Sequence, residues 1–107
     1  MPRADARDIV PTLENPKGIE SETEKAWQAR GFSCGLWVDA PGQQWNDFVH
    51  STDELLMLVE GDLELEMHGR TFRPHPGEEV LIPARVSHSV RNVGNTTAKW
   101  LYGYKRS

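Results

Sequence analysis

The sequence has few of the features that stabilise secreted proteins or anchor membrane proteins. Cys34 is the only cysteine among 107 residues, so no disulfide forms within the chain, and its apolar surroundings predict a buried, unreactive thiol. The longest aliphatic run, residues 55–59, is far shorter than the roughly 20 residues of a membrane-spanning helix. The first residues contain no apolar stretch suited to a signal peptide. We therefore expect a cytoplasmic protein that does not enter a membrane.

Positive charge is also scarce. The chain has 12 lysines and arginines against 16 acidic residues, a net charge of -4, and so lacks a broad cationic surface for a phosphate backbone. We expect no nucleic acid partner. The length suits one domain with one core. Residues 1–20, rich in charge and proline, predict a loosely ordered or docked arm, and residues 21–107 predict the single domain.

The sequence lacks a long helical pattern, whereas short β-like runs separated by glycine and proline are frequent. Leu63, Leu65 and Met67 alternate with acidic residues, which is the period of a half-buried strand over 62–67. By the same reasoning we expect strands over 31–39, 44–50, 53–60, 70–73, 78–82, 87–93 and 97–104. Many short strands joined by tight turns predict a β-sandwich or barrel.

Two imidazoles and one carboxylate fall on these expected strands. His50 and His88 approach Glu54 if the sheet closes into a barrel. The strand over 53–60 is apolar on both faces, so the Glu54 carboxylate needs a partner, a proton or a metal ion. Two neutral imidazoles and a carboxylate around open positions suit Fe, Mn, Ni or Zn. Asp47 adds a fourth ligand only if a bulge turns it inward, because strict alternation points it outward.

The spacing of these residues resembles the paired motifs of the cupin superfamily. The first pattern, Gly-x5-His-x-His-x3-Glu-x6-Gly, falls on residues 42–61 and departs only at Phe48. The second, Gly-x5-Pro-x-Gly-x2-His-x3-Asn, falls on residues 77–92 and departs only at Arg85. The resemblance implies an all-β double-stranded β-helix, or jelly-roll barrel, usually dimeric, with one divalent transition metal inside. Phe48 stands where the family's first histidine ligand would be, which leaves either a three-ligand site or a barrel without metal.

Several residues near the motifs are candidates for contact with a small molecule. Trp45 either stacks on a planar ligand at the pocket entrance or fills the core. Arg85 either meets an anion at the barrel mouth or makes a structural ion pair. The phenol of Tyr102 either donates a hydrogen bond or packs. Together with Phe48 at the vacated ligand position, these residues form the predicted substrate-binding set: Trp45, Phe48, Arg85 and Tyr102.

The resemblance implies activities such as those of dioxygenases, decarboxylases, isomerases and epimerases. We expect a small-molecule metalloenzyme of dioxygenase-like or isomerase-like chemistry, and the absence of an identifiable base apart from the ligands favours the former. The alternative is a non-catalytic barrel that binds or senses a small ligand. Leu55, Met57 and Val59 form an outward apolar face that needs a cover, which predicts a homodimer.

Overall fold

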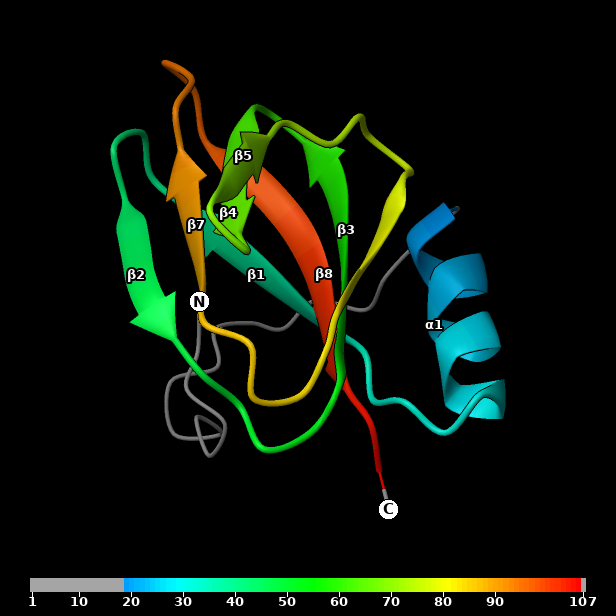
Figure 1. Ribbon diagram of the computed structural model, residues 1–107. Coiled ribbons are helices and arrows are strands. Elements are labelled where there is room, and N and C mark those ends of the chain that lie inside the picture. The colour runs from blue at the N-terminus through cyan, green and yellow to red at the C-terminus, as the bar shows by residue number, and fades with distance from the viewer. Residues whose placement is uncertain (1–18, 107) are drawn as a thin grey trace.

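The computed structural model describes residues 19–106 (Figure 1), so nearly all of the predicted N-terminal arm lies outside the described residues. The eight predicted strands are all present, within a few residues of the expected bounds. No helix in this part of the chain is long and apolar enough to cross a membrane. The elements are α1 (Ile19–Ala29), β1 (Gly35–Asp39), β2 (Gln44–Phe48), β3 (Glu54–Glu60), β4 (Leu63–Met67), β5 (Arg70–Phe72), β6 (Glu79–Ile82), β7 (His88–Asn92) and β8 (Ala98–Tyr104).

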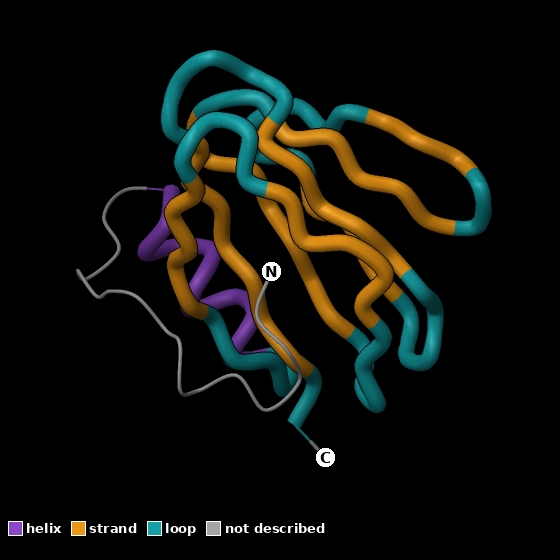
Figure 2. The backbone as a smooth tube through the Cα atoms, turned by 90° about the vertical axis from the view of Figure 1, so that its left-hand side faces the viewer, coloured by secondary structure: helices purple, strands orange, loops and turns teal. Residues whose placement is uncertain are grey.

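The strands form two four-stranded antiparallel sheets, ordered β1-β8-β3-β6 and β2-β7-β4-β5. The sheets form two layers, seen from the side in Figure 2. Alternate side chains of each sheet fill the space between them: Leu56 and Leu58 of β3 join one core cluster with Leu63 and Leu65 of β4 and with Val90 of β7. The predicted all-β fold of packed sheets is therefore confirmed.

The sequence predicts no long helix, and the structure adds a helix of 11 residues, α1, which packs on the outer face of the β1-β8-β3-β6 sheet (Figures 1 and 2). Trp27 is 1% exposed and shares a second core cluster with Leu55, Met57 and Leu101. Its indole N–H donates to Glu79 Oε1 at 3.0 Å. The segment IESETEKAWQA is mostly polar, so it carries no wide apolar stripe from which a helix is recognised.

This helix also changes the argument for a homodimer. Leu55 and Met57 are covered by α1, and Val59 packs against the same cluster, so their outward face does not need a second subunit. The homodimer stays a prediction, without its original support. Cys34 packs at the edge of this cluster and is half-buried, whereas the sequence predicts a buried thiol.

A buried carboxylate at the end of β1 organises three of the four tryptophans. Asp39 is 2% exposed and accepts indole N–H bonds from Trp37 at 2.8 Å, Trp45 at 3.1 Å and Trp100 at 3.2 Å. Indole N–H groups need an acceptor when they are buried, and one carboxylate has enough lone pairs for all three. Trp45 is thus a half-buried part of the core, and its N–H is already bonded.

Candidate metal centre

Three side chains from three parts of the chain meet inside the barrel. Glu54 is the first residue of β3, His88 is the first residue of β7, and His50 lies in the connection between β2 and β3. Glu54 Oε1 lies 3.4 Å from His50 Nε2 and 3.6 Å from His88 Nε2. Their candidate ligand atoms all lie within 4.8 Å of one another, and none of the three residues is more than 3% exposed. The structure therefore brings together the three residues predicted from the sequence.

The donor atoms of this cluster fit a metal ion better than they fit one another. Both ring nitrogens of His50 and both carboxylate oxygens of Glu54 are buried without a hydrogen-bond partner among the described residues. Buried polar atoms are rarely left so, because each costs on the order of 1–3 kcal/mol. Two ligands of one transition-metal ion, each about 2.1 Å from it, are roughly 3 to 3.6 Å apart, close to the separations observed.

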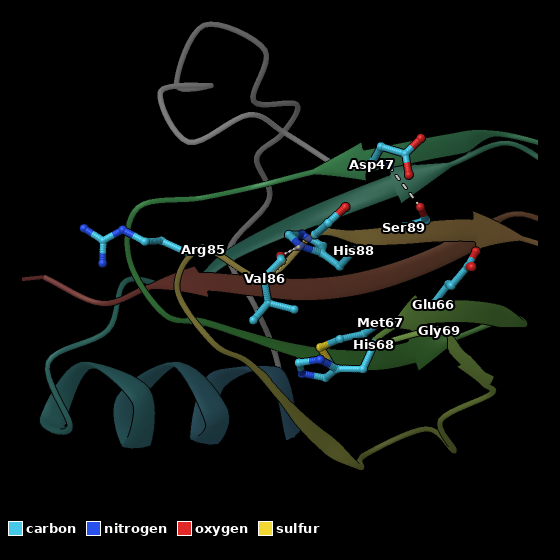
Figure 3. Close-up of a pocket in the computed structure, with 10 residues that line it drawn as sticks. Asp47, Glu66, Met67, His68, Gly69, Arg85, Val86, His88 and Ser89 are labelled. Atoms are coloured by element: carbon cyan, nitrogen blue, oxygen red, sulfur yellow. Dashed lines mark hydrogen bonds between the residues drawn. The ribbon is translucent and has the colours of Figure 1, made fainter.

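His88 is oriented by a backbone contact. Its Nδ1 lies 3.0 Å from the carbonyl oxygen of Val86, drawn as a dashed line in Figure 3. A carbonyl only accepts, so this contact places the proton on Nδ1 and leaves the Nε2 lone pair facing Glu54. A second hydrogen bond that fixes the orientation of the ring through one nitrogen is the usual state of a metal-binding histidine.

Burial shifts the titration of two members of the cluster in opposite directions. Burial, with a smaller contribution from the charge of His88, lowers the pKa of His50 from 6.5 to about 4. Burial raises the pKa of the Glu54 carboxyl from 4.5 to about 7, although the nearby His88 acts in the other direction. Without a metal ion, the site therefore favours a neutral imidazole at His50 and a partly protonated Glu54 near neutral pH.

Aromatic rings surround His50. The Phe48 ring stacks on the imidazole, with centroids 6.5 Å apart and an interplanar angle of 14°. The ring of Tyr104, from the other sheet, lies at a steep angle to the imidazole, with centroids 4.9 Å apart. In the sequence Tyr104 shares a face of its strand with Tyr102, which favours ordinary packing for both phenols, and the pairing of β3 with β8 places Tyr104 opposite Glu54. Burial, and secondarily the charge of Glu54, raises the pKa of the Tyr104 phenol.

Tyr102, proposed from the sequence as a substrate contact, lies two residues before Tyr104 in β8. It is 8% exposed, and its ring lies 6.1 Å from those of Trp37 and Trp100. Burial, followed by the charge of Glu54, raises the pKa of its phenol. Tyr102 is thus chiefly part of the aromatic core.

Asp47 does not join the cluster. The register between β2 and β7 shifts between Trp45 and Phe48, so the bulge is present, and Asp47 has a positive φ of 60°. The side chain of Asp47 is nevertheless exposed, and its backbone N–H donates to Ser89 Oγ at 3.0 Å (Figure 3). The bulge turns the carboxylate outward, which leaves a three-residue ligand set.

A pocket of 440 Å³ adjoins the cluster at one residue (Figure 3). It is lined by Asp47 and by residues 66–69 and 85–89, which include His88 but neither His50 nor Glu54. The pocket therefore borders the turn residue Val86 as well as His88, and the aromatic rings around His50 are not part of its wall.

Arg85 borders this pocket, but its side chain points away from the other lining residues in Figure 3. It is exposed and forms no ion pair with any residue in the described range 19–106. Its φ is +66°, a left-handed conformation that costs a residue with a Cβ about 1–2 kcal/mol. The arginine therefore stands at a position suited to glycine.

Replacing Arg85 with glycine should release this strain. Allowing for the greater entropy of glycine in the unfolded chain, we expect R85G to raise the free energy of unfolding by about 0.5–1 kcal/mol. R85A is the matched control, because it removes the guanidinium and keeps the Cβ. Urea unfolding of both variants measures the effect, and equal stability of R85G and R85A would contradict it.

Comparison with known proteins places the chain in a family. A model of the cupin domain family matches residues 35–104. Polyketide synthase CurC of Streptomyces cyaneus is 33% identical over 73 residues, which are 67% of this chain and 47% of that protein. The 5-nitrosalicylic acid 1,2-dioxygenase of Bradyrhizobium sp is 28% identical over 89 residues, which are 83% of this chain and 42% of that protein. The chain thus spans less than half the length of these two relatives.

A solved structure agrees at the level of the fold. The crystal structure of a Cupin 2 conserved barrel domain protein from Salinispora arenicola matches with a TM-score of 0.65 and 23% sequence identity. The match covers 72% of this chain and 65% of that one. The predicted jelly-roll barrel is therefore confirmed.

Proposed function

The chain belongs to the cupin domain family, and from that premise we propose that it is a metal-dependent enzyme acting on a small molecule, with His50, Glu54 and His88 as the metal ligands. The observation that carries this proposal is the set of buried donor atoms of His50 and Glu54 without partners. A purely structural barrel gains nothing from such atoms, because an unpaired buried carboxylate destabilises the fold.

The ligand set indicates the class of chemistry. Two histidines and one carboxylate leave open positions, and an ion held there polarises a substrate oxygen or activates dioxygen. Glu54 contributes the single negative charge, and His88 is held by Val86 in the tautomer that can bind metal. Fe, Mn, Ni and Zn all suit these ligands.

Oxygenase-like chemistry is the form of this proposal that we favour over isomerase-like chemistry. An isomerase needs a positioned base in addition to the ligands. Tyr104 brings a titratable side chain to the cluster, with its ring 4.9 Å from that of His50, and its raised pKa makes the phenol a poor base. One relative is named as a 1,2-dioxygenase of a substituted salicylic acid, which supports small aromatic acids as the first compounds to test.

Metal analysis of the untagged protein, purified without chelator, tests the proposal. We expect close to one transition-metal ion per chain in the wild type, and almost complete loss of that ion in His50→Ala and His88→Ala with the fold retained. His75→Ala is the matched control, because His75 is exposed and lies outside the cluster. Full metal content in both ligand variants would refute the site. If both variants lose the metal, oxygen uptake by the wild type with aromatic acids tests the reaction class.

The second candidate is a barrel that binds or senses a small ligand without catalysis. The replacement of a motif histidine by Phe48 favours it, because the ring occupies a position where the family pattern has a ligand. A wild-type protein that takes up no metal, even when ions are supplied, would move the assignment to this candidate.

A further inference from the structure

A tight turn between β6 and β7 contacts both histidines of the cluster. The carbonyl of Pro83 accepts the N–H of Val86 at 3.3 Å, which closes a four-residue turn. Arg85 has a positive φ and Ala84 does not, the pattern of a type II turn. The Arg85 N–H donates to the backbone carbonyl of His50 at 2.7 Å, and the Val86 carbonyl meets His88 Nδ1 at 3.0 Å. One rigid turn therefore holds His50 by its backbone and His88 by its ring.

Asp53 fastens this turn to the strand that carries Glu54. Its Oδ1 accepts the N–H of Ala84 at 2.8 Å. The backbone of Asp53 is held separately, because its carbonyl accepts the N–H of Lys105 at 2.9 Å. The carboxylate is thus a short link between the residue next to Glu54 and the turn that contacts both imidazoles.

Asp53 lies outside the ligand cluster although it is the neighbour of Glu54 in the chain. It is not part of the group of side chains within 4.8 Å of one another, and it is half-buried whereas the ligands are fully buried. Its Oδ1 accepts a backbone N–H at 2.8 Å, so this oxygen is bonded to the turn.

We propose that Asp53 is a positioning residue of the metal centre, which acts through the turn of residues 83–86 to set the spacing of the two imidazoles. This inference rests on the proposed function, since it concerns the affinity of the same site. Residues that orient metal ligands typically change metal affinity about 10- to 100-fold when they are replaced. Asp53 is linked to each histidine by two hydrogen bonds, its own bond to the turn and the bond from the turn to that histidine. A displacement of Asp53 therefore reaches both imidazoles through the turn.

Two variants break the link from opposite ends. Asp53→Ala removes the acceptor, and Ala84→Pro removes the donor N–H at a turn position where proline is favoured. Asp53→Asn keeps an oxygen that can accept the same bond. Asp62→Ala is the matched control: Asp62 is exposed and precedes Leu63, which pairs with Asn92 at the far end of β7 from His88.

The experiment titrates Zn²⁺ into chelator-stripped protein against a chromophoric competitor, and measures the unfolding free energy of each metal-free variant in parallel. We expect Asp53→Ala and Ala84→Pro to weaken Zn²⁺ binding about 10- to 100-fold, with Asp53→Asn and Asp62→Ala close to the wild type. A merely structural role would lower stability and leave the Zn²⁺ affinity of the folded protein unchanged. If Asp53→Ala does not fold, the affinity of Ala84→Pro decides.

The outcomes separate the two proposals. Tight Zn²⁺ binding by the wild type with equal affinity in Asp53→Ala and Ala84→Pro overturns the positioning role and leaves the metal site intact. A loss of Zn²⁺ affinity in these two variants, with wild-type affinity in Asp53→Asn, supports the positioning role. A wild type that binds no Zn²⁺ or other transition metal defeats the proposed function, and with it the positioning role.

Discussion

Replacement of Asp39 with alanine is expected to lower the free energy of unfolding by about 4 kcal/mol. The carboxylate accepts the indole N–H groups of Trp37, Trp45 and Trp100, and the first and last of these residues are buried. Removing the shared acceptor leaves up to three donors unsatisfied, each at a cost of about 1–3 kcal/mol, with the half-buried Trp45 nearest the lower value. Because small domains are stable by only about 5–15 kcal/mol, this variant approaches the limit of folding.

The size of this loss depends on the acceptor and not on the volume removed. Asp39→Asn keeps one acceptor oxygen and turns the other position into a donor, so we expect roughly half the loss of the alanine variant. Asp62→Ala, which removes an exposed carboxylate, should change stability by less than about 0.5 kcal/mol. Chemical unfolding followed by circular dichroism makes the comparison, and a loss below about 1 kcal/mol in Asp39→Ala would show that the indoles find other acceptors.

The same substitution should leave metal binding intact in the molecules that remain folded. Asp39 pairs with Ala98 at one end of β8, whereas Glu54 pairs with Tyr104 at the other. Tyr104 lies six positions after Ala98 along β8, which is about 20 Å. The barrel therefore has a hydrogen-bond network around Asp39 that stabilises one end, and the candidate metal ligands at the other end.

The strands could be predicted from the sequence because they depend on local pattern, and the ligand cluster could be predicted because its spacing resembles a motif of a known fold. Alternation of apolar and polar residues marked the strands, and Leu63, Leu65 and Met67 behave as expected, with the first two fully buried. The spacing of His50, Glu54 and His88 predicted the cluster because a jelly roll brings the starts of β3 and β7 together.

What the sequence did not predict depends on contacts across the fold. Helix α1 buries mainly Trp27 and Thr23 among the side chains described there, too few for a 3.6-residue pattern to stand out. The role of Asp39 follows from three tryptophans on three strands meeting one carboxylate. A signal did exist, since Trp37 and Asp39 share a face of one strand and an inward carboxylate needs donors.

Replacing Glu54 with glutamine should make the metal-free protein more stable relative to the wild type at pH 8 than at pH 4.5, by about 3 kcal/mol. The cause is the pKa of the Glu54 carboxyl, which burial raises from 4.5 to about 7. A carboxyl with a higher pKa in the folded state holds its proton longer there than in the unfolded chain. Stability is therefore fully present below pH 4.5, falls as pH rises through 7, and levels off above it, with each pKa unit worth about 1.4 kcal/mol.

Glutamine does not titrate, so its variant escapes this loss, and His50 is present in both proteins and largely cancels in the comparison. Urea unfolding in chelator at the two pH values measures the effect, and a difference independent of pH would contradict a buried, unpaired carboxylate. Zn²⁺ at a concentration of 1,000 Kd should reverse the order at pH 8, because it stabilises only the protein that binds it, by about 4.1 kcal/mol, which exceeds the advantage of about 3 kcal/mol of the glutamine variant. A buried metal ligand is expected to weaken the empty fold and to strengthen the occupied one, since the burial that raises the pKa of Glu54 is offset when its oxygens bind the ion.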